Sequence, residues 1–451
     1  MEIIGWLYQF YIAEKKDEVM ARKKAVPTED IPAVTQLFTP HWIVRYLVEN
    51  SLGRVWLLNR PGSRLRELMP FYIEGEAETD FLKITKPEEI KLLDPACGSG
   101  HMLTYAFDLL TLIYEEEGYS PSEISGLILQ HNLYGLEIYP RAAQLTELAL
   151  LFKAREKSRR FFYSEQLVRP QVLELQNIYF TQDELNAYIE ALDLGELFDF
   201  GVYKLLQQFE EAKNLGSLIQ PCLDERAIAP VRRAIEAKDL GGQLILRETH
   251  LKVLRVLEQA EALTQRYHFV VANPPYMGGK SQSASLAAFL SQHYASGKKD
   301  LFSSFALRAL SLIRRNVIEA QVVPYVWMFI SSFEAFRREI WEQASLSSLV
   351  RLEYNAFEPA CVPVCLYVLK AKAKSISRAT FIDLDQFKGH ENQSPRLLEA
   401  IDNSECSWRY KRALDDIAKL PGGILAFWLP ESLIAMLGTS KCLVHDGRKR
   451  G

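Results

Sequence analysis

Apolar and polar positions along this chain follow two alternating patterns. Short apolar runs such as residues 269–272 are rich in β-branched side chains, which is typical of strands buried on both faces of a parallel sheet. Between them lie longer segments with apolar residues every three or four positions, as in residues 101–113, and these predict amphipathic helices. Strands that alternate with helices indicate an α/β fold with a parallel, doubly wound sheet.

The same patterns place further elements. An amphipathic helix is predicted over residues 42–48, and Asp300 is predicted to open another helix. Additional strands are predicted over residues 92–93, 132–136, 321–326 and 362–369. We expect the last of these to be the final strand of the core.

The segment Asn273-Pro274-Pro275-Tyr276 directly follows the apolar run 269–272. Two prolines end the strand because neither can donate to a sheet ladder. Asn273 precedes a proline and therefore favours an extended backbone, on a stiff loop where open α/β sheets bind ligands. The Asn273 amide oxygen and the Pro274 carbonyl are two acceptors suited to both hydrogens of a planar amino group, and Tyr276 offers a face for stacking a base. Taken alone, the segment is also compatible with an ordinary Pro-Pro turn.

A second motif, Asp94-Pro95-Ala96-Cys97-Gly98-Ser99-Gly100, lies between a predicted strand and a predicted helix. Its two glycines allow positive φ and a close approach of the backbone to a ligand, as in nucleotide-binding loops. The next predicted strand ends at Glu137, whose carboxylate could accept hydrogen bonds from two ribose hydroxyls. Asp94 stands at the loop entrance, where a cationic part of a ligand would lie.

These motifs, in this order, resemble the S-adenosylmethionine-dependent adenine-N6 DNA methyltransferases of the γ arrangement. Residues 38–53 and 132–142 are similar to the PglX type of these enzymes, which belongs to bacterial BREX phage-exclusion systems. The similarity extends to about residue 437. It implies a Rossmann-like methyltransferase fold interrupted by a helical insertion.

The resemblance also implies roles for individual residues. The residues implied to bind the cofactor S-adenosylmethionine are Phe38, Thr39, Pro40, Asp94, Pro95, Ala96, Gly98, Gly100 and Glu137. The implied catalytic residues are Asn273, Pro274, Pro275 and Tyr276, which would act on the N6 amino group of an adenine flipped out of DNA. Tyr276 and Phe357 are candidates for stacking on that base, although an ordinary core phenylalanine is an equally good reading of Phe357.

Six segments follow from this interpretation. They are 1–60 with N-terminal helices and the cofactor-closing loop, 61–90 as a surface insertion, 91–181 as the cofactor-binding half, 182–265 as a helical insertion, 266–373 as the catalytic half, and 374–451 as the start of an incomplete C-terminal region. The insertion 182–265 is either an arm that contacts DNA or a partner, or, as we favour, a helical unit packed on the core.

Charge and cysteine usage change this picture only slightly. The chain has 53 basic and 57 acidic residues and a net charge of −4, so the dominant basic surface usual for a DNA enzyme is missing. Lys280, Lys298 and Lys299 flank the catalytic segment and are the candidates for phosphate contacts. Six scattered cysteines suit a reducing cytoplasm, and Cys361 and Cys365 lack partners for a zinc site. No apolar run reaches membrane-spanning length. We expect a cytoplasmic protein without a metal site or a membrane span.

Other functions stay open at this point. Asn-Pro-Pro-Tyr also serves methyltransferases that modify glutamine amides in proteins, and adenine in RNA presents the same chemistry, although the large insertions favour a nucleic acid. A non-catalytic interaction module is a different class. Residues 441–451 do not look like family sequence, and we expect a truncated chain without a complete recognition domain. DNA and other phage-defence proteins are the expected partners.

Overall fold

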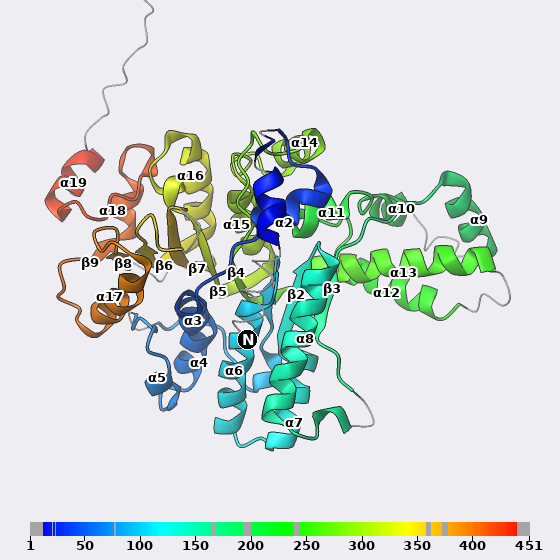
Figure 1. Cartoon of the computed structure of the whole chain (residues 1–451), viewed down its shortest axis with the longest axis horizontal. Helices are drawn as coiled ribbons and strands as arrows, with labels where there is room; N and C mark the ends of the chain where they lie inside the picture. The colour runs from blue at the N-terminus through cyan, green and yellow to red at the C-terminus, as the bar shows by residue number, and fades with distance from the viewer. Residues whose placement is uncertain are drawn as a thin grey trace, which may run out of the picture.

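The computed structural model describes residues 12–19, 21–22, 24–75, 78–163, 167–192, 200–238, 244–357, 362–371 and 378–439. Within these residues nine strands form one sheet in the order β3-β2-β1-β4-β5-β7-β6-β8-β9 (Figure 1). Their bounds are β1 Leu92–Asp94, β2 Leu133–Glu137, β3 Gln171–Glu174, β4 Tyr267–Ala272, β5 Ile313–Pro324, β6 Ala344–Arg351, β7 Val364–Ala371, β8 Arg378–Asp383 and β9 Arg409–Ala413.

Strands β1 to β5 are all parallel, and the order reverses between β1 and β4. The chain builds β2 and β3 on one side of β1 and then returns to place β4 and β5 on the other side. Open sheets of this kind bind ligands at the carboxyl ends of the strands that flank such a reversal. The prediction of an α/β, doubly wound sheet is therefore confirmed.

The sheet is covered on both faces, because successive residues of its strands enter different hydrophobic clusters. Leu92 and Phe269 point to the cluster that contains helix α6, whereas Leu93 and Val270 point to the cluster that contains helix α15. The longer helices are α3 His41–Val48, α6 His101–Glu116, α8 Pro140–Lys157, α9 Gln182–Leu192, α10 Phe200–Gln207, α12 Glu225–Glu236, α13 Leu244–Thr264, α14 Ala284–His293, α15 Leu301–Leu312, α16 Glu334–Gln343, α17 His390–Asp402 and α19 Glu431–Thr439.

Shorter helices complete the description. They are α2 Ile31–Thr35, α4 Arg54–Asn59, α5 Leu65–Leu68, α7 Pro121–Leu127, α11 Ala212–Leu215, α18 Leu414–Ala418 and the 3₁₀ turns η1 Thr28–Asp30, η7 Gly216–Leu218 and η8 Tyr325–Met328. As predicted, Asp300 opens a helix, since its carboxylate accepts from the backbone N–H of Phe302 at the start of α15. No helix in the described part of the chain is long and apolar enough to cross a bilayer.

Two expectations differ from the structure. The expected surface insertion over residues 61–90 instead supplies core side chains, with Met69 and Ile73 buried beside α3 and α6. Its prolines, glycines and acids conceal these apolar positions in the sequence. The strand expected to be the last of the core, now β7, lies between β5 and β6, and β8 and β9 extend the same sheet.

The region between β3 and β4 holds helices α9 to α13, which lie to the right of the sheet in Figure 1. Leu205 and Val256 of these helices belong to the same hydrophobic cluster as Leu93 of β1. The insertion is thus packed against the core through apolar contacts. Cys361 and the unusual tail 441–451 lie outside the described residues.

Candidate active site

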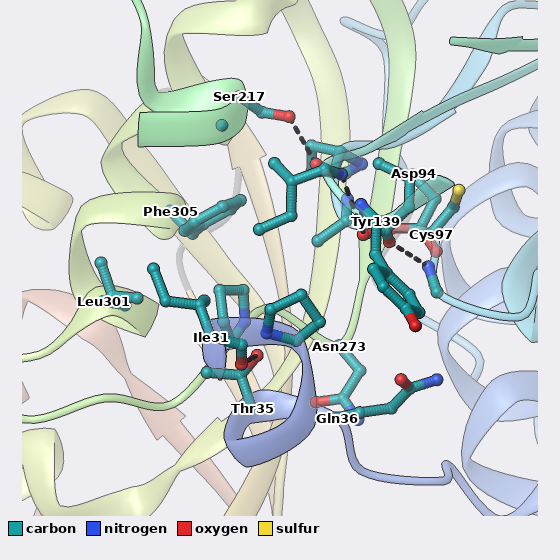
Figure 2. Close-up of a pocket in the computed structure, with 18 of the residues that line it drawn as sticks. Ile31, Thr35, Gln36, Asp94, Cys97, Tyr139, Ser217, Asn273, Leu301 and Phe305 are labelled. Carbon is teal, nitrogen blue, oxygen red and sulfur yellow. Dashed lines mark hydrogen bonds between the residues drawn. The ribbon is translucent and has the colours of Figure 1, made fainter. Parts of the chain in front are cut away.

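A cavity of about 1070 Å³, including space open to solvent, lies at the carboxyl ends of β1, β2 and β4. Figure 2 shows Asp94, Cys97 and Tyr139 on one side of it and Leu301 and Phe305 on the other. The predicted site residues that line the cavity are Phe38, Thr39, Asp94, Pro95, Ala96, Gly98, Glu137, Asn273 and Pro275. The structure therefore brings both sequence motifs and the loop upstream of α3 to one place.

The glycine-rich loop has a backbone that only glycine adopts easily. Gly98 and Gly100 have φ of 54° and 83°, in the left-handed region. A Cβ at Gly100 would lie 2.8 Å from Cγ2 of Thr146, so the loop also depends on close packing against α8. Thr146 donates its hydroxyl to the Gly98 carbonyl at 2.7 Å and holds the loop in this shape.

Glu137 fixes the loop from the end of β2. Its Oε2 accepts from the Gly98 N–H at 2.8 Å, and its Oε1 accepts from the N–H groups of Ile138 and Tyr139 at 2.9 and 3.0 Å. Burial raises the pKa of Glu137, and these three hydrogen bonds oppose the rise. A carboxylate offers about four acceptor directions, so roughly one is left for a ligand hydroxyl rather than the expected two.

Asp94 carries a carboxyl group that is buried at the end of β1. Its Oδ1 accepts from the Ala96 N–H at 3.1 Å, and its exposed fraction is 2%. Burial raises the pKa of Asp94 to about 8; the Ala96 hydrogen bond opposes the shift and the Glu137 carboxylate adds to it. No cation among the described residues stabilises the charged form. A cationic group placed beside Asp94 would favour its charged form.

Asn273 faces the cavity from the end of β4 with a defined amide orientation. Its Nδ2 donates to the Leu37 carbonyl at 3.2 Å and to Oγ1 of Thr39 at 3.0 Å. A carbonyl can only accept, so the nitrogen must lie on that side and Oδ1 on the other. Oδ1 accepts from the Tyr276 hydroxyl at 2.7 Å and keeps a second lone pair for a substrate.

The Tyr276 hydroxyl lies between two acceptors. It is 2.7 Å from Oδ1 of Asn273 and 2.7 Å from the Val322 carbonyl of β5, and it has one hydrogen to donate. The ring packs edge-on against Phe302, with centroids 6.4 Å apart, and it is not part of the cavity lining. In this arrangement the Tyr276 hydroxyl orients the Asn273 amide.

The loop before α3 closes one side of the cavity. Helix α2 and residues 36–39 border it, and the Phe38 ring meets the His101 ring edge-on at 4.6 Å. His101, the first residue of α6, also lines the cavity, and burial and the nearby His41 lower its pKa to about 4. It is therefore a neutral imidazole at pH 7.

Sequence reasoning missed one wall of the cavity, which residues 214–218 of the insertion supply. Ser217 donates its hydroxyl to the Pro95 carbonyl at 2.5 Å (Figure 2). Buried Arg308 holds this segment by donating to the carbonyls of Ser217 and Ile219, both at 2.8 Å. Gly216 has φ of 56°, in the left-handed region, and forms the start of η7 in this wall.

The remaining predicted residues lie outside the cavity lining. Phe357 is buried in the core with 2% of its surface exposed, which fits the alternative reading of an ordinary core phenylalanine. Lys280, Lys298 and Lys299 are exposed. The Gly279 N–H donates to the Lys299 carbonyl at 3.1 Å, which brings these lysines to neighbouring loops. Pro40, Gly100 and Pro274 are also absent from the lining, although each neighbours a residue that borders the cavity.

A search for metal ligands gives no group of three or more His, Cys, Asp or Glu side chains suited to a metal ion in the described ranges. The cavity combines a floor with two buried carboxyl groups, a glycine-rich wall, and an amide oxygen at its edge.

Comparison with known proteins gives a consistent picture. The profile of the Eco57I restriction-modification methylase family matches residues 131–357. The adenine-specific methyltransferase BrxX of Escherichia coli O9:H4 (strain HS) is 38% identical over 461 residues, covering 95% of this chain and 37% of the relative. The adenine-specific methyltransferase PglX of Lacticaseibacillus casei (strain Zhang) is 35% identical over 457 residues, covering 97% of this chain and 38% of the relative.

The chain thus spans less than two fifths of the length of these curated relatives. Among solved structures, the ATP-dependent Type ISP restriction-modification enzyme LlaBIII bound to DNA has a TM-score of 0.49 and 11% identity, covering 83% of this chain and 21% of that one. The matched family region contains β4, β5, β6 and the Asn-Pro-Pro-Tyr segment, and it makes up half of the 451 residues. The resemblance to PglX-type adenine-specific methyltransferases is confirmed, and the chain belongs to the Eco57I restriction-modification methylase family.

Proposed function

We propose that this chain transfers a methyl group from S-adenosylmethionine to the N6 amino group of adenine in DNA, as part of a bacterial phage-defence system of the BREX kind. The observation that carries the proposal is the placement of the Asn273 amide oxygen at the edge of a cavity whose floor holds Asp94 and Glu137. Oδ1 of Asn273 can accept a hydrogen bond from an amine, and the adjoining cavity suits a cationic nucleoside. Both lie at the carboxyl edge of the sheet, where open α/β sheets bind ligands.

The cavity residues fit the cofactor. The carboxyl group of Asp94 suits the cationic methionine end, the remaining acceptor direction of Glu137 suits a ribose hydroxyl, and the loop at Gly98 and Gly100 allows close approach. When bound, the cofactor supplies an activated methyl group on a sulfonium. The protein's task is then chiefly to align the attacking nitrogen with that methyl group.

On the substrate side, Oδ1 of Asn273 would accept one hydrogen of the adenine amino group and the Pro274 carbonyl the other. The base must leave the duplex to reach this point, at a cost of a few kcal/mol. In this proposal a movement of Tyr276 away from Phe302 would be needed before its ring could stack on the base. Lys280, Lys298 and Lys299 are exposed beside the catalytic loop and are proposed to contact phosphates of the flipped strand.

The test is transfer of a labelled methyl group to duplex DNA, to RNA, and to a mixture of proteins, each with wild-type chain and with Asn273→Ala. We expect labelled N6-methyladenine in DNA with the wild type only. Label on glutamine or on RNA would identify one of the rival substrates. If wild type and Asn273→Ala both bind S-adenosylmethionine but neither transfers a methyl group to any substrate, the result would favour a non-catalytic interaction module.

A further inference from the structure

A second cavity lies at the opposite, amino edge of the sheet. It is bordered by the starts of β4 and β5, the end of β7, and the ends of α15 and α16. Its charged lining residues are Arg266, Arg314 and Arg315, accompanied by the polar side chains of Ser311 and Gln343. No acidic side chain is part of this lining. The cavity is separate from the candidate active site, because β4 and β5 run between them.

Two of the arginines stand on an irregular stretch of β5. Tyr267 of β4 pairs with Ile313 and Phe269 pairs with Ile318, so residues 314–317 all stand opposite the single residue His268. Asn316 has φ of 62°, a conformation that few residues other than glycine adopt. A bulge of this kind re-aims the side chains that it carries. Here it presents Arg314 and Arg315 to solvent.

The three arginines are not neutralised by neighbours. Among the described residues, none of Arg266, Arg314 and Arg315 forms an ion pair or a side-chain hydrogen bond, and all three are exposed. In a chain with a net charge of −4, such a cluster stands out from its surroundings.

The positive charge of Arg314 lowers the pKa values of two nearby basic groups, His268 and Lys91. The pKa of His268 is lowered to about 4, chiefly by burial, and Arg314 and Lys91 contribute to this shift. The pKa of Lys91 is likewise lowered by burial and by Arg314. Glu89 raises the pKa of His268 and Glu225 raises the pKa of Lys91, against the effect of Arg314, and neither acid borders the cavity. Asp80, which accepts a hydrogen bond from Asn316 of the same bulge at 2.6 Å, is also absent from the lining.

We propose that this cavity is an anion site for a phosphate group, carried either by the DNA backbone or by a free phosphate compound such as a nucleotide. Guanidinium groups bind phosphate oxygens through paired N–H donors, so arginines gathered around one cavity suit this ligand class. The site does not depend on the proposed methyl transfer and is measured by binding alone.

The test uses the full chain and two probes, pyrophosphate by calorimetry and a short DNA duplex by fluorescence anisotropy at several salt concentrations. The test variant is Arg314→Gln with Arg315→Gln. The control is Arg338→Gln, an exposed arginine of α16 that pairs with Glu334 at 2.9 Å. Both variants change surface residues, and circular dichroism verifies that they fold.

Loss of pyrophosphate binding by about tenfold or more in the test variant, with the control unchanged, supports a free phosphate ligand. If pyrophosphate does not bind but the salt dependence of DNA binding falls by about one ion per arginine removed, the DNA backbone is the ligand. The proposal is overturned if the test variant matches wild type with both probes, or if the control loses binding equally.

Discussion

Nδ2 of Asn273 lies 3.0 Å from Oγ1 of Thr39, although 234 residues separate the two in the chain. Nδ2 of Asn273 also donates to the Leu37 carbonyl, so two hydrogen bonds join the amide to this loop. The amide that would hold the substrate amine is thus fastened to the loop that closes the cofactor cavity. The position of that loop and the direction of the Asn273 oxygen are therefore linked.

Asn273→Ala removes this amide, and we expect methyl transfer to fall by about 100-fold or more, the scale for a group that acts in the transition state. Cofactor affinity should change by less than about tenfold, because the nitrogen only fastens the loop. Single-turnover transfer and calorimetry measure the two effects. Asn392→Ala, at an exposed position of α17, serves as the control. Transfer within a few-fold of wild type would remove Asn273 from its assigned role.

Tyr276→Phe keeps the ring and deletes the hydroxyl between Asn273 and Val322. Since the lost hydrogen bond is worth about 1 kcal/mol, we expect transfer to slow by about fivefold with cofactor affinity unchanged. Tyr276→Leu also deletes the aromatic face and separates stacking from orientation. Wild-type rates in the Phe variant together with a slow Leu variant would assign Tyr276 to stacking alone.

Glu137→Ala leaves three backbone N–H groups without their acceptor. We expect S-adenosylmethionine binding to weaken by about 1–3 kcal/mol, the range for unpaired polar groups, and the melting temperature to fall as well. Glu123→Ala, at the exposed start of α7, is the matched control. An unchanged cofactor affinity in Glu137→Ala would take this residue out of the cofactor site.

Asp94 makes the affinity for a cationic cofactor depend on pH. With its pKa raised to about 8, the carboxyl group is mostly neutral at pH 6.5 and must lose a proton to bind a cation. Affinity should therefore rise with pH, by at most tenfold per unit, until about pH 8, with proton release on binding. Without ligand the sign for folding is opposite: the stability linked to the protonated group is lost as pH rises through about 8.

Calorimetry at pH 6.5 and 8.5, in buffers of different ionisation enthalpy, measures this release. Asp94→Asn carries no such proton, so its pH dependence reports only titrations of the ligand and of other groups. If wild type and Asp94→Asn show the same pH dependence, the raised pKa plays no part in binding.

Local patterns were enough to predict the parts of the site that follow strands. The end of β1 at Asp94, the end of β2 at Glu137 and the end of β4 at Ala272 each follow a short apolar run. Because parallel strands place their carboxyl ends at one edge, these residues had to lie close together.

Other parts depend on contacts between distant segments, which periodicity does not encode. Residues 214–218 reach the cavity only because Arg308 binds the carbonyls of Ser217 and Ile219. The second acceptor of the Tyr276 hydroxyl, the Val322 carbonyl, is set by the pairing of β4 with β5. The core role of Met69 and Ile73 was hidden because apolar positions in an irregular segment show no period.

The single hydroxyl hydrogen that Asn273 and Val322 share has a consequence for discrimination. With two oxygens competing for one hydrogen, this corner of the site is short of donors, so a further oxygen would only add repulsion. An exocyclic amine brings hydrogens and relieves the shortage, whereas a keto group at the same ring position does not. In the proposed reaction, the Asn273 amide oxygen, the Val322 carbonyl and the Tyr276 hydroxyl would therefore favour adenine over deaminated adenine. This discrimination would not require contacts that read the base sequence.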